Sequence, residues 1–302
     1  MTGQQQRVSG LELWQWRTVA LCAAIAADVP PAEVDWLLQE LAGLDRLALR
    51  LEYFKDWPQI QLKLPLKELD LLWQRRLHDR LPVQYIAGFA HWRNFKLAVS
   101  AAVLIPRPET ECLIDLAVAS AKNSWANQLE QGDWADLGTG SGAIALGLAD
   151  AFAAAKIHAV DCSQAARAIA LANAQQLGFA DRIHFYQGSW WEPLKSLLGQ
   201  VSGMVANPPY IPSTLVPHLQ PEVAHHEPHL ALDGGVDGLE CIRHLVETSP
   251  AYLRSGGVWL IEMMVGQAQT VTELLQNQGS YCNIEIHADL AGIERFALAY
   301  RV

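Results

Sequence analysis

The tetrapeptide Asn207-Pro208-Pro209-Tyr210 combines residues that suit chemistry on a nitrogen atom. An asparagine amide supplies one acceptor oxygen, and the proline after it stiffens the backbone while keeping a carbonyl acceptor. The Asn207 side-chain oxygen and the Pro208 carbonyl can together accept both hydrogens of one NH2 group. The Tyr210 ring can stack on a planar group and exclude water. The tetrapeptide therefore predicts a substrate site, walled in part by Pro209, for an amide-like or amine nitrogen.

The nitrogen of an amide is a weak nucleophile because its lone pair is delocalised. Hydrogen bonds that strengthen as this nitrogen becomes pyramidal stabilise the transition state more than the ground state. Holding the nitrogen in line with an activated methyl group at about 3 to 3.5 Å adds a proximity effect, and no base has to act first. Alone, the tetrapeptide also fits a proline-stiffened loop with a buried tyrosine, so its position after an expected strand favours the catalytic interpretation.

A glycine-rich turn lies between an expected strand and an expected helix, with the sequence Gly138-Thr139-Gly140-Ser141-Gly142. Glycine lets the backbone approach a ligand closely, and doubly wound sheets bind nucleotides at such a turn after their first strand. The spacing is G-x-G-x-G, whereas a turn that cradles a pyrophosphate has G-x-G-x-x-G. This spacing favours S-adenosyl-L-methionine, which carries an amino acid, a sulfonium and a nucleoside but no pyrophosphate.

Two further residues are expected at this cofactor. Asp161 ends the next strand, about twenty residues after the turn, where an acid is expected to accept hydrogen bonds from ribose hydroxyls. Trp190 follows the third strand and can flank an adenine ring, although an aromatic residue there can equally cap the hydrophobic core. Asn207 follows the fourth strand and is therefore expected to reach the cofactor as well as the substrate.

The elements that position these residues follow from the alternation of short apolar runs with helical patterns after residue 106. This alternation predicts an α/β fold with a mostly parallel, doubly wound sheet in residues 106–302. Two late β-rich runs predict an antiparallel hairpin added at the end of the chain. The apolar runs are 134–137, 157–160, 183–186, 203–206 and 258–261, and the hairpin runs are 283–287 and 295–302.

Residues 1–82 show helical periodicity and no strand alternation, which predicts a small all-α domain joined to the rest by a linker at 83–105. Apolar residues at spacings of three and four are expected to share buried faces, and the charged residues between them are expected to stay solvated. The first set comprises Val34, Leu37, Leu38, Leu41, Leu69, Leu72, Trp73 and Leu77, and the second comprises Arg75, Arg76, His78 and Arg80.

Composition narrows the classes of partner and compartment. The formal net charge of -10 provides no large basic field for phosphates, so no direct nucleic-acid binding is expected. The five cysteines lie far apart without zinc-like spacing, which is typical of a reducing compartment. The longest apolar run, 19–27, is too short to cross a membrane, and no signal-peptide pattern precedes it. These features predict a cytoplasmic protein without a membrane partner.

The combination of motifs resembles the PrmC/HemK family, the protein-glutamine N5-methyltransferases that modify bacterial peptide chain release factors. The resemblance covers most of the chain and rests on the segments 82–88 (Pro-Val-Gln-Tyr-Ile-Ala-Gly), 105–111 (Ile-Pro-Arg-Pro-Glu-Thr-Glu), 136–142, 207–210 and 231–239. It implies a class I S-adenosylmethionine-dependent methyltransferase, Rossmann-like, plus a helical N-terminal domain that helps dock the release factor. It also implies that the acceptor is the glutamine of a Gly-Gly-Gln loop, whose amide Asn207 and Pro208 would bind.

Several alternatives stay open at this stage. A sister group methylates a glutamine of a ribosomal protein, and related enzymes with the same tetrapeptide methylate exocyclic amines of nucleic acids. A non-catalytic factor-binding module that retains the pocket is a third alternative. Arg107 could reach the cofactor or substrate, or its segment could simply begin a helix. His225, His226 and His229 cluster in one proline-interrupted loop, which rarely completes a metal shell, so no metal is expected.

Overall fold

The computed structural model describes residues 6–302, which form two compact units. The first unit contains the chain up to Phe89 together with Gln220–His226, and the second contains Ala90–Leu219 and Glu227–Val302. The segment 83–105, expected to be a linker, is largely structured. It contains α5 (Val83–Ala87) and a hairpin of β3 (Phe89–Trp92) and β4 (Phe95–Ala98), and the boundary between the units falls inside it.

The first unit is mainly helical and packs around its own hydrophobic core. It also contains one element that the sequence analysis did not predict, an antiparallel pair of strands with three residues each. Three residues are too few to show a period-two pattern, which explains why no strand was expected there. The elements are β1 (Gln6–Val8), α1 (Gly10–Ala26), α2 (Ala32–Ala42), α3 (Arg46–Leu51), β2 (Ile60–Leu62), α4 (Leu66–His78) and α9 (Pro221–Ala224).

The buried face of α4 confirms the helical periodicity, since Leu69, Trp73 and Leu77 all lie in the core. The expectation that Arg76 stays solvated is wrong, because Arg76 is only 4% exposed. Its guanidinium lies between two carboxylates, Glu33 at 2.7 Å and Glu222 at 2.6 Å. Burial of a charge requires such partners, and Glu222 comes from a distant segment of the chain that periodicity cannot reveal.

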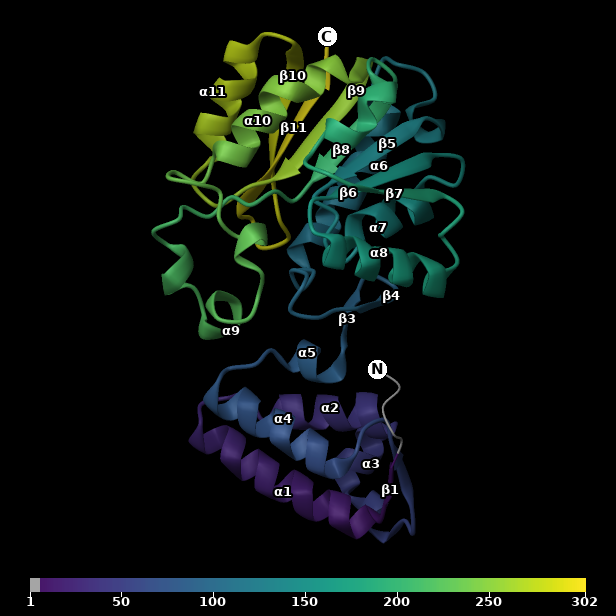
Figure 1. Cartoon of the computed structure of the whole chain (residues 1–302), viewed down its shortest axis with the longest axis vertical. Coiled ribbons are helices and arrows are strands. Elements are labelled where there is room, and N and C mark those ends of the chain that lie inside the picture. The colour runs from purple at the N-terminus through teal and green to yellow at the C-terminus, as the bar shows by residue number, and fades with distance from the viewer. Residues whose placement is uncertain (1–5) are drawn as a thin grey trace. The chain divides into compact units, whose positions relative to one another are not determined.

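The second unit is built on a seven-stranded sheet in the order β10-β11-β9-β8-β5-β6-β7 (Figure 1). The strands from β9 to β7 are parallel, while β11 pairs antiparallel with both β9 and β10. This confirms the mostly parallel sheet with a terminal antiparallel hairpin. The strands are β5 (Asp133–Leu137), β6 (Lys156–Asp161), β7 (Ile183–Gln187), β8 (Val201–Ala206), β9 (Leu253–Glu262), β10 (Tyr281–Ala288) and β11 (Glu294–Arg301).

Helices cover both faces of this sheet and complete a three-layer α/β/α arrangement (Figure 1). One face packs against α6 (Cys112–Asn123), α7 (Ala143–Ala151) and α8 (Gln164–Leu177). The other face packs against α10 (Glu240–Thr248) and α11 (Ala268–Gln278). Because the central strands are buried on both faces, they read as continuous apolar runs in the sequence.

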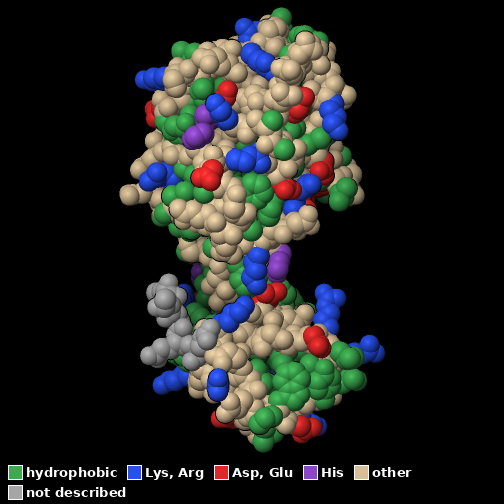
Figure 2. Space-filling view, turned by 90° about the vertical axis from the view of Figure 1, so that its right-hand side faces the viewer, with side chains coloured by type: hydrophobic (Ala, Val, Ile, Leu, Met, Phe, Trp, Pro, Cys, Tyr) green, Lys and Arg blue, Asp and Glu red, His purple; other side chains and the backbone are tan. Residues whose placement is uncertain are grey.

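The surface of the second unit carries charges of both signs. On the face shown in Figure 2, basic and acidic side chains are interspersed, and the basic ones do not merge into one continuous patch. Among residues 6–302, none of the helices combines the length and the apolar character that a bilayer crossing demands.

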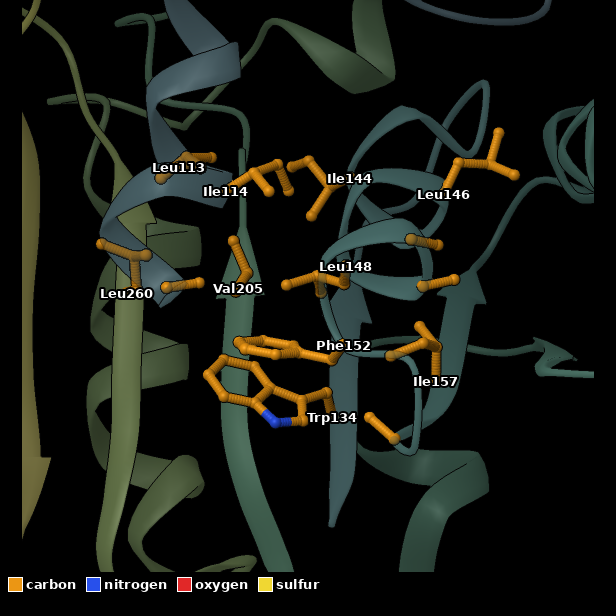
Figure 3. Close-up of a cluster of buried hydrophobic side chains, with 14 of the residues drawn as sticks. Leu113, Ile114, Trp134, Ile144, Leu146, Leu148, Phe152, Ile157, Val205 and Leu260 are labelled. Atoms are coloured by element: carbon orange, nitrogen blue, oxygen red, sulfur yellow. The ribbon is translucent and has the colours of Figure 1, made fainter. Parts of the chain in front are cut away.

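The core on the α6–α8 side of the sheet packs tightly against β5, the first strand of the sheet in chain order (Figure 3). Trp134 of β5 is fully buried and packs against Phe152, with 4.7 Å between the ring centroids. A Cβ atom on Gly203 of β8 would lie 2.4 Å from the Trp134 ring, so only glycine fits beside it. The close packing of these two strands brings their carboxyl ends, and the loops that follow them, to one edge of the sheet.

Candidate active site

A cavity of about 290 Å³ opens at the carboxyl edge of the parallel strands, close to the lower end of the range for small-molecule sites, about 300 to 1,000 Å³. Loops after β5, β6, β7 and β8 all contribute to its wall. Among the residues singled out from the sequence, those that line it are Gly138, Thr139, Gly140, Ser141, Asp161, Trp190, Asn207 and Pro209. Within residues 6–302, Gly142, Pro208 and Tyr210 are not part of this lining.

The glycine turn adopts the backbone that only glycine takes easily, with φ of 85° at Gly138, 55° at Gly140 and 85° at Gly142. The amides of Gly138 and Thr139 both donate to the Val160 carbonyl at 2.9 Å, which ties the turn to β6. A Cβ atom on Gly140 would meet no protein atom within 4 Å, so this side of the turn is open. Gly142 instead faces α8, where a Cβ atom would lie 3.1 Å from that of Ala170.

Asp161 connects the end of β6 to the glycine turn. Its Oδ2 accepts a hydrogen bond from the Gly140 amide at 2.9 Å, and its Oδ1 accepts one from the Ser163 amide at 2.8 Å. Burial raises the pKa of this carboxyl group, against the effect of the two amides. A carboxylate has about four lone-pair positions, so this side chain retains acceptor capacity toward the cavity.

Asp136 supports the turn from below. This carboxyl group is fully buried, and its Oδ2 accepts hydrogen bonds from the Thr139 hydroxyl at 2.6 Å and the Ala145 amide at 2.9 Å. Its Oδ1 has no hydrogen-bond partner within residues 6–302. Burial raises the pKa of Asp136 to about 7, with a smaller contribution from the nearby Asp161 charge. The turn is therefore held in shape by a carboxyl group that sits close to its titration point.

The two tryptophans after β7 have different environments. Trp190 lines the cavity beside Gly138, in the left-handed region of the backbone with φ of 49°. Trp191 is buried in the core, stacks on Tyr252 with 4.5 Å between ring centroids, and donates to the Ser249 hydroxyl at 3.0 Å. Trp190 also packs, partly buried, against the same core as Trp191, so its position is compatible with both interpretations considered for it.

The tetrapeptide Asn207–Tyr210 follows β8 directly, and two of its residues, Asn207 and Pro209, line the same cavity. The Asn207 amide nitrogen donates to the Thr110 hydroxyl at 3.3 Å. The Tyr210 hydroxyl donates to Glu262 Oε1 at 3.0 Å, and burial raises the pKa of this phenol. Gln267 donates from its side chain to the Tyr210 carbonyl at 3.0 Å, so both ends of this residue are held.

Three residues that anchor the tetrapeptide were missed by sequence reasoning: Thr110, Glu262 and Gln267. Glu262 is 2% exposed and follows the apolar run 258–261 of β9, and an acid in that position was the available signal. Thr110 lies inside the segment 105–111 that carried the family resemblance, but no role was given to it. Gln267 begins the segment leading to α11 and offers no signal of its own in the sequence.

Glycines of the segment 231–239 pack directly on the tetrapeptide. A Cβ atom on Gly238, where φ is 75°, would lie 2.3 Å from the Tyr210 carbonyl oxygen. A Cβ atom on Gly234 would lie 2.8 Å from the Pro209 carbonyl oxygen. Hydrogen bonds of Ile211 with Leu232 and Gly234 join the two segments as a short parallel bridge. The backbone after Asn207 is therefore fixed by close contact that larger residues would prevent.

Arg107 lies in a segment that begins a helix, one of the two interpretations considered for it, because Pro108 precedes a 3-10 turn at Glu109–Glu111 that continues directly into α6. Its guanidinium pairs with Glu227 Oε1 at 2.6 Å, and Glu227 Oε2 accepts the Ile105 amide at 3.2 Å. Glu227 is 4% exposed, and burial raises its pKa although Arg107 opposes the effect. This pair ties the segment before α6 to the loop whose next residues, including Pro228, line the cavity.

The histidine loop is divided between the two units, since His225 and His226 belong to the first and His229 to the second. His226 Nε2 contacts the Asp79 carbonyl oxygen at 2.5 Å. Within residues 6–302, no group of three or more His, Cys, Asp or Glu side chains is arranged to hold a metal ion.

Comparisons of the sequence and of the fold with known proteins both point to a methyltransferase domain. Residues 118–220 match the family model described as the methyltransferase small domain. The solved structure of the hMettl16 catalytic domain in complex with a MAT2A 3'UTR hairpin superimposes with a TM-score of 0.56 at 16% identity. This match covers 68% of this chain and 75% of that one, and it supports the fold alone. The fold and the site define a class I S-adenosylmethionine-dependent methyltransferase.

Curated relatives narrow the class to one family. A release factor glutamine methyltransferase from Synechocystis sp. is 52% identical over 97% of this chain and 97% of its own length. Proteins of the same name from Thermosynechococcus vestitus and Gloeobacter violaceus are 48% and 42% identical over 95% and 94% of this chain, and each match covers 96% of the relative. This chain belongs to the release factor glutamine methyltransferase family.

Proposed function

We propose that this enzyme transfers a methyl group from S-adenosyl-L-methionine to the side-chain amide nitrogen of the glutamine in the Gly-Gly-Gln loop of a peptide chain release factor. The single observation that carries the proposal is that Asn207 and the glycine turn line one cavity, in a chain 52% identical to a release factor glutamine methyltransferase. For direct transfer of the methyl group in a single step, the nitrogen that receives it and the cofactor that donates it have to bind in one cavity.

The residues present fit the methyl donor. Gly140 leaves the turn open toward a ligand, Asp161 offers acceptor lone pairs for ribose hydroxyls, and Trp190 offers a flat apolar surface for adenine. Bound there, S-adenosyl-L-methionine supplies a methyl group already activated by a sulfonium. The residues proposed to hold it are Gly138, Thr139, Gly140, Ser141, Gly142, Asp161, Trp190 and Asn207. Gly142 would act indirectly, by shaping the turn against α8.

The residues proposed to act on the glutamine amide are Asn207, Pro208 and Tyr210, with Pro209 as part of the wall. The Asn207 oxygen and the Pro208 carbonyl would accept the two amide hydrogens and aim the nitrogen at the methyl group. Support comes from Asn207, whose amide nitrogen donates one hydrogen bond to Thr110, while its side-chain oxygen stays available as an acceptor for a ligand. Tyr210, held at its hydroxyl and its carbonyl, would pack against the planar amide and exclude water.

The helical unit, residues 1–82 in the sequence-based division, is proposed to dock the release factor, with 106–302 carrying the chemistry and 83–105 joining them. We also propose a cytoplasmic location, which the proposed release factor substrate supports because release factors act in translation. We propose no direct nucleic-acid partner, because the net charge is -10 and basic side chains do not form a continuous patch on the face in Figure 2.

The direct test is peptide mass spectrometry of a release factor incubated with the enzyme and labelled cofactor. The expected result is one added methyl group on the glutamine of the Gly-Gly-Gln loop, with no label when that glutamine is replaced. DNA, RNA and ribosomal protein are offered in parallel reactions. Labelling of one of these and not of the release factor would overturn the proposal.

A further inference from the structure

Glu262 lies beneath the tetrapeptide at the end of β9 and is almost completely buried. Its Oε2 accepts the Thr110 hydroxyl hydrogen at 2.7 Å, and its Oε1 accepts the Tyr210 hydroxyl hydrogen at 3.0 Å. Burial raises the pKa of this carboxyl group, and the hydrogen bonds from Thr110 and Tyr210 oppose that effect by favouring the ionised form, in which both oxygens accept. A buried carboxylate that nothing in the reaction requires would be costly to retain, so its two partners point to its role.

The Glu262 carboxylate determines which group donates in the hydrogen bond between Thr110 and Asn207. Because the single Thr110 hydrogen is committed to Glu262, the Thr110 oxygen can only accept from Asn207. The Asn207 group that faces Thr110 must then be the NH2 group, as observed at 3.3 Å. The Asn207 oxygen consequently lies on the other side of the amide. Without Glu262, the Thr110 hydroxyl could donate to Asn207, and the amide could rotate to present NH2 groups where an acceptor is needed.

We infer that Glu262 is a positioning residue that fixes the polarity of the Asn207 amide through Thr110 and the orientation of the Tyr210 ring directly. The inference rests on the proposed function and adds a source of specificity to it. An outward oxygen accepts hydrogen from a glutamine amide, whereas it repels the carboxylate of a glutamate. The charged groups that act on the pKa of Glu262 are Arg295 of β11, which is itself paired with Asp289 and lowers this pKa, and Glu109 before α6, which raises it.

The test compares Glu262→Gln and Thr110→Val with the wild-type enzyme, and uses Glu273→Gln, on the exposed side of α11, as the matched control. Glutamine keeps the shape of Glu262 but replaces one acceptor oxygen by a donor. We expect kcat for release factor methylation to fall about 10- to 100-fold in both site variants, as small misplacements of a reacting group do. The dissociation constant of the cofactor is expected to change less than about threefold, and Glu273→Gln to keep wild-type kcat.

Two further measurements separate positioning from simple structural support. Thr110→Ser retains the hydroxyl and is expected to recover most of the kcat that Thr110→Val loses. Glu262→Gln removes a buried charge and is expected to keep or raise the melting temperature at pH 8. The inference is overturned if Glu262→Gln retains wild-type kcat, if Thr110→Ser is as slow as Thr110→Val, or if the loss of kcat follows a loss of folded protein. Absence of release factor methylation by the wild-type enzyme would instead overturn the proposed function itself.

Discussion

The guanidinium of Arg76 contacts the carboxylate of Glu222, which lies 146 positions later in the chain, at 2.6 Å. The same guanidinium makes a two-point contact with Glu33 at 2.7 and 2.9 Å. The Arg76 side chain is 5% exposed, while the two carboxylates are 19% and 26% exposed. One buried cation thus holds α9, which comes after the Asn207–Tyr210 tetrapeptide in sequence, onto the helices of the first unit.

Replacing this cation with an apolar side chain of similar length should destabilise the protein. In Arg76→Met the two carboxylates lose their shared partner, and we expect the free energy of unfolding to fall by about 3 kcal/mol. Arg75→Met is the matched control, because Arg75 is 54% exposed and its contact with Asp79 is 3.7 Å, so we expect a change within about 0.5 kcal/mol. Urea unfolding followed by circular dichroism measures both, and equal effects would contradict this account of Arg76.

Removing the Asn207 amide should separate catalysis from cofactor binding. Asn207→Ala eliminates the acceptor proposed to orient the substrate nitrogen, so we expect kcat to fall at least about 100-fold. The cofactor dissociation constant, measured by calorimetry, is expected to change far less, since the turn, Asp161 and Trp190 are intact. Asn127→Ala, at an exposed position, serves as the control. Unchanged turnover in Asn207→Ala would remove this residue from the mechanism.

A methyl group added to the glycine turn should block the cofactor without striking the protein. Gly140→Ala places a Cβ atom where no protein atom lies within 4 Å, so its main partner would be the ligand. We expect at least about a tenfold loss of cofactor affinity, with a backbone cost of about 1 to 2 kcal/mol from the left-handed conformation. Gly178→Ala, at φ of 79° with equally open space, has the same backbone cost outside the cavity. Equal cofactor affinity in the two variants would contradict the proposed binding site.

The buried carboxyl group of Asp136 should make stability depend on pH. The folded state holds its proton with a pKa of about 7, whereas an ordinary aspartate has a pKa of 3.8, so its contribution to stability is full below pH 3.8 and is lost as the pH rises through 7. Asp161, whose charge also affects Asp136, is present in both the wild type and Asp136→Asn, so its own titration contributes to both curves. Between pH 5 and 6 we expect wild type to lose about 1.2 kcal/mol per pH unit more than Asp136→Asn, measured by urea unfolding without cofactor, and this difference in slope to halve by pH 7. Parallel curves for the two proteins would show that Asp136 does not titrate in this range.

The parts of the fold that were predictable are those whose signal is local. The mainly apolar runs 134–137, interrupted by the buried Asp136, and 203–206 mark β5 and β8, because strands buried on both faces are rich in apolar residues. The position of Asn207 after β8, and of the glycines after β5, then follows from the parallel topology. The left-handed φ values of the three glycines accord with the reason for expecting glycine there.

The parts that were not predictable depend on pairs distant in sequence. Glu262 and Thr110 are 152 positions apart, and neither shows from its own neighbours that they share a hydrogen bond. The helical pattern alone predicts that Arg76 is a solvated charge, because the sequence does not show that Glu222 packs beside it. The hairpin of β3 and β4 is short and rich in aromatic residues, so its segment was interpreted as a connection. In each case the missing information is which segments meet, and periodicity does not contain it.

The discontinuity of the first unit limits how the enzyme can be divided. A fragment containing only residues 90–302 would keep Gln220–His226 but lack the helices on which this stretch rests. Glu222 would then lose its ion-pair partner Arg76. The segment between the tetrapeptide and Pro228, which lines the cavity, would lose this stabilising contact. A truncation at Phe89 would thus also disturb the second unit. A shortened enzyme would in addition need Gln220–His226 deleted and Leu219 joined to Glu227.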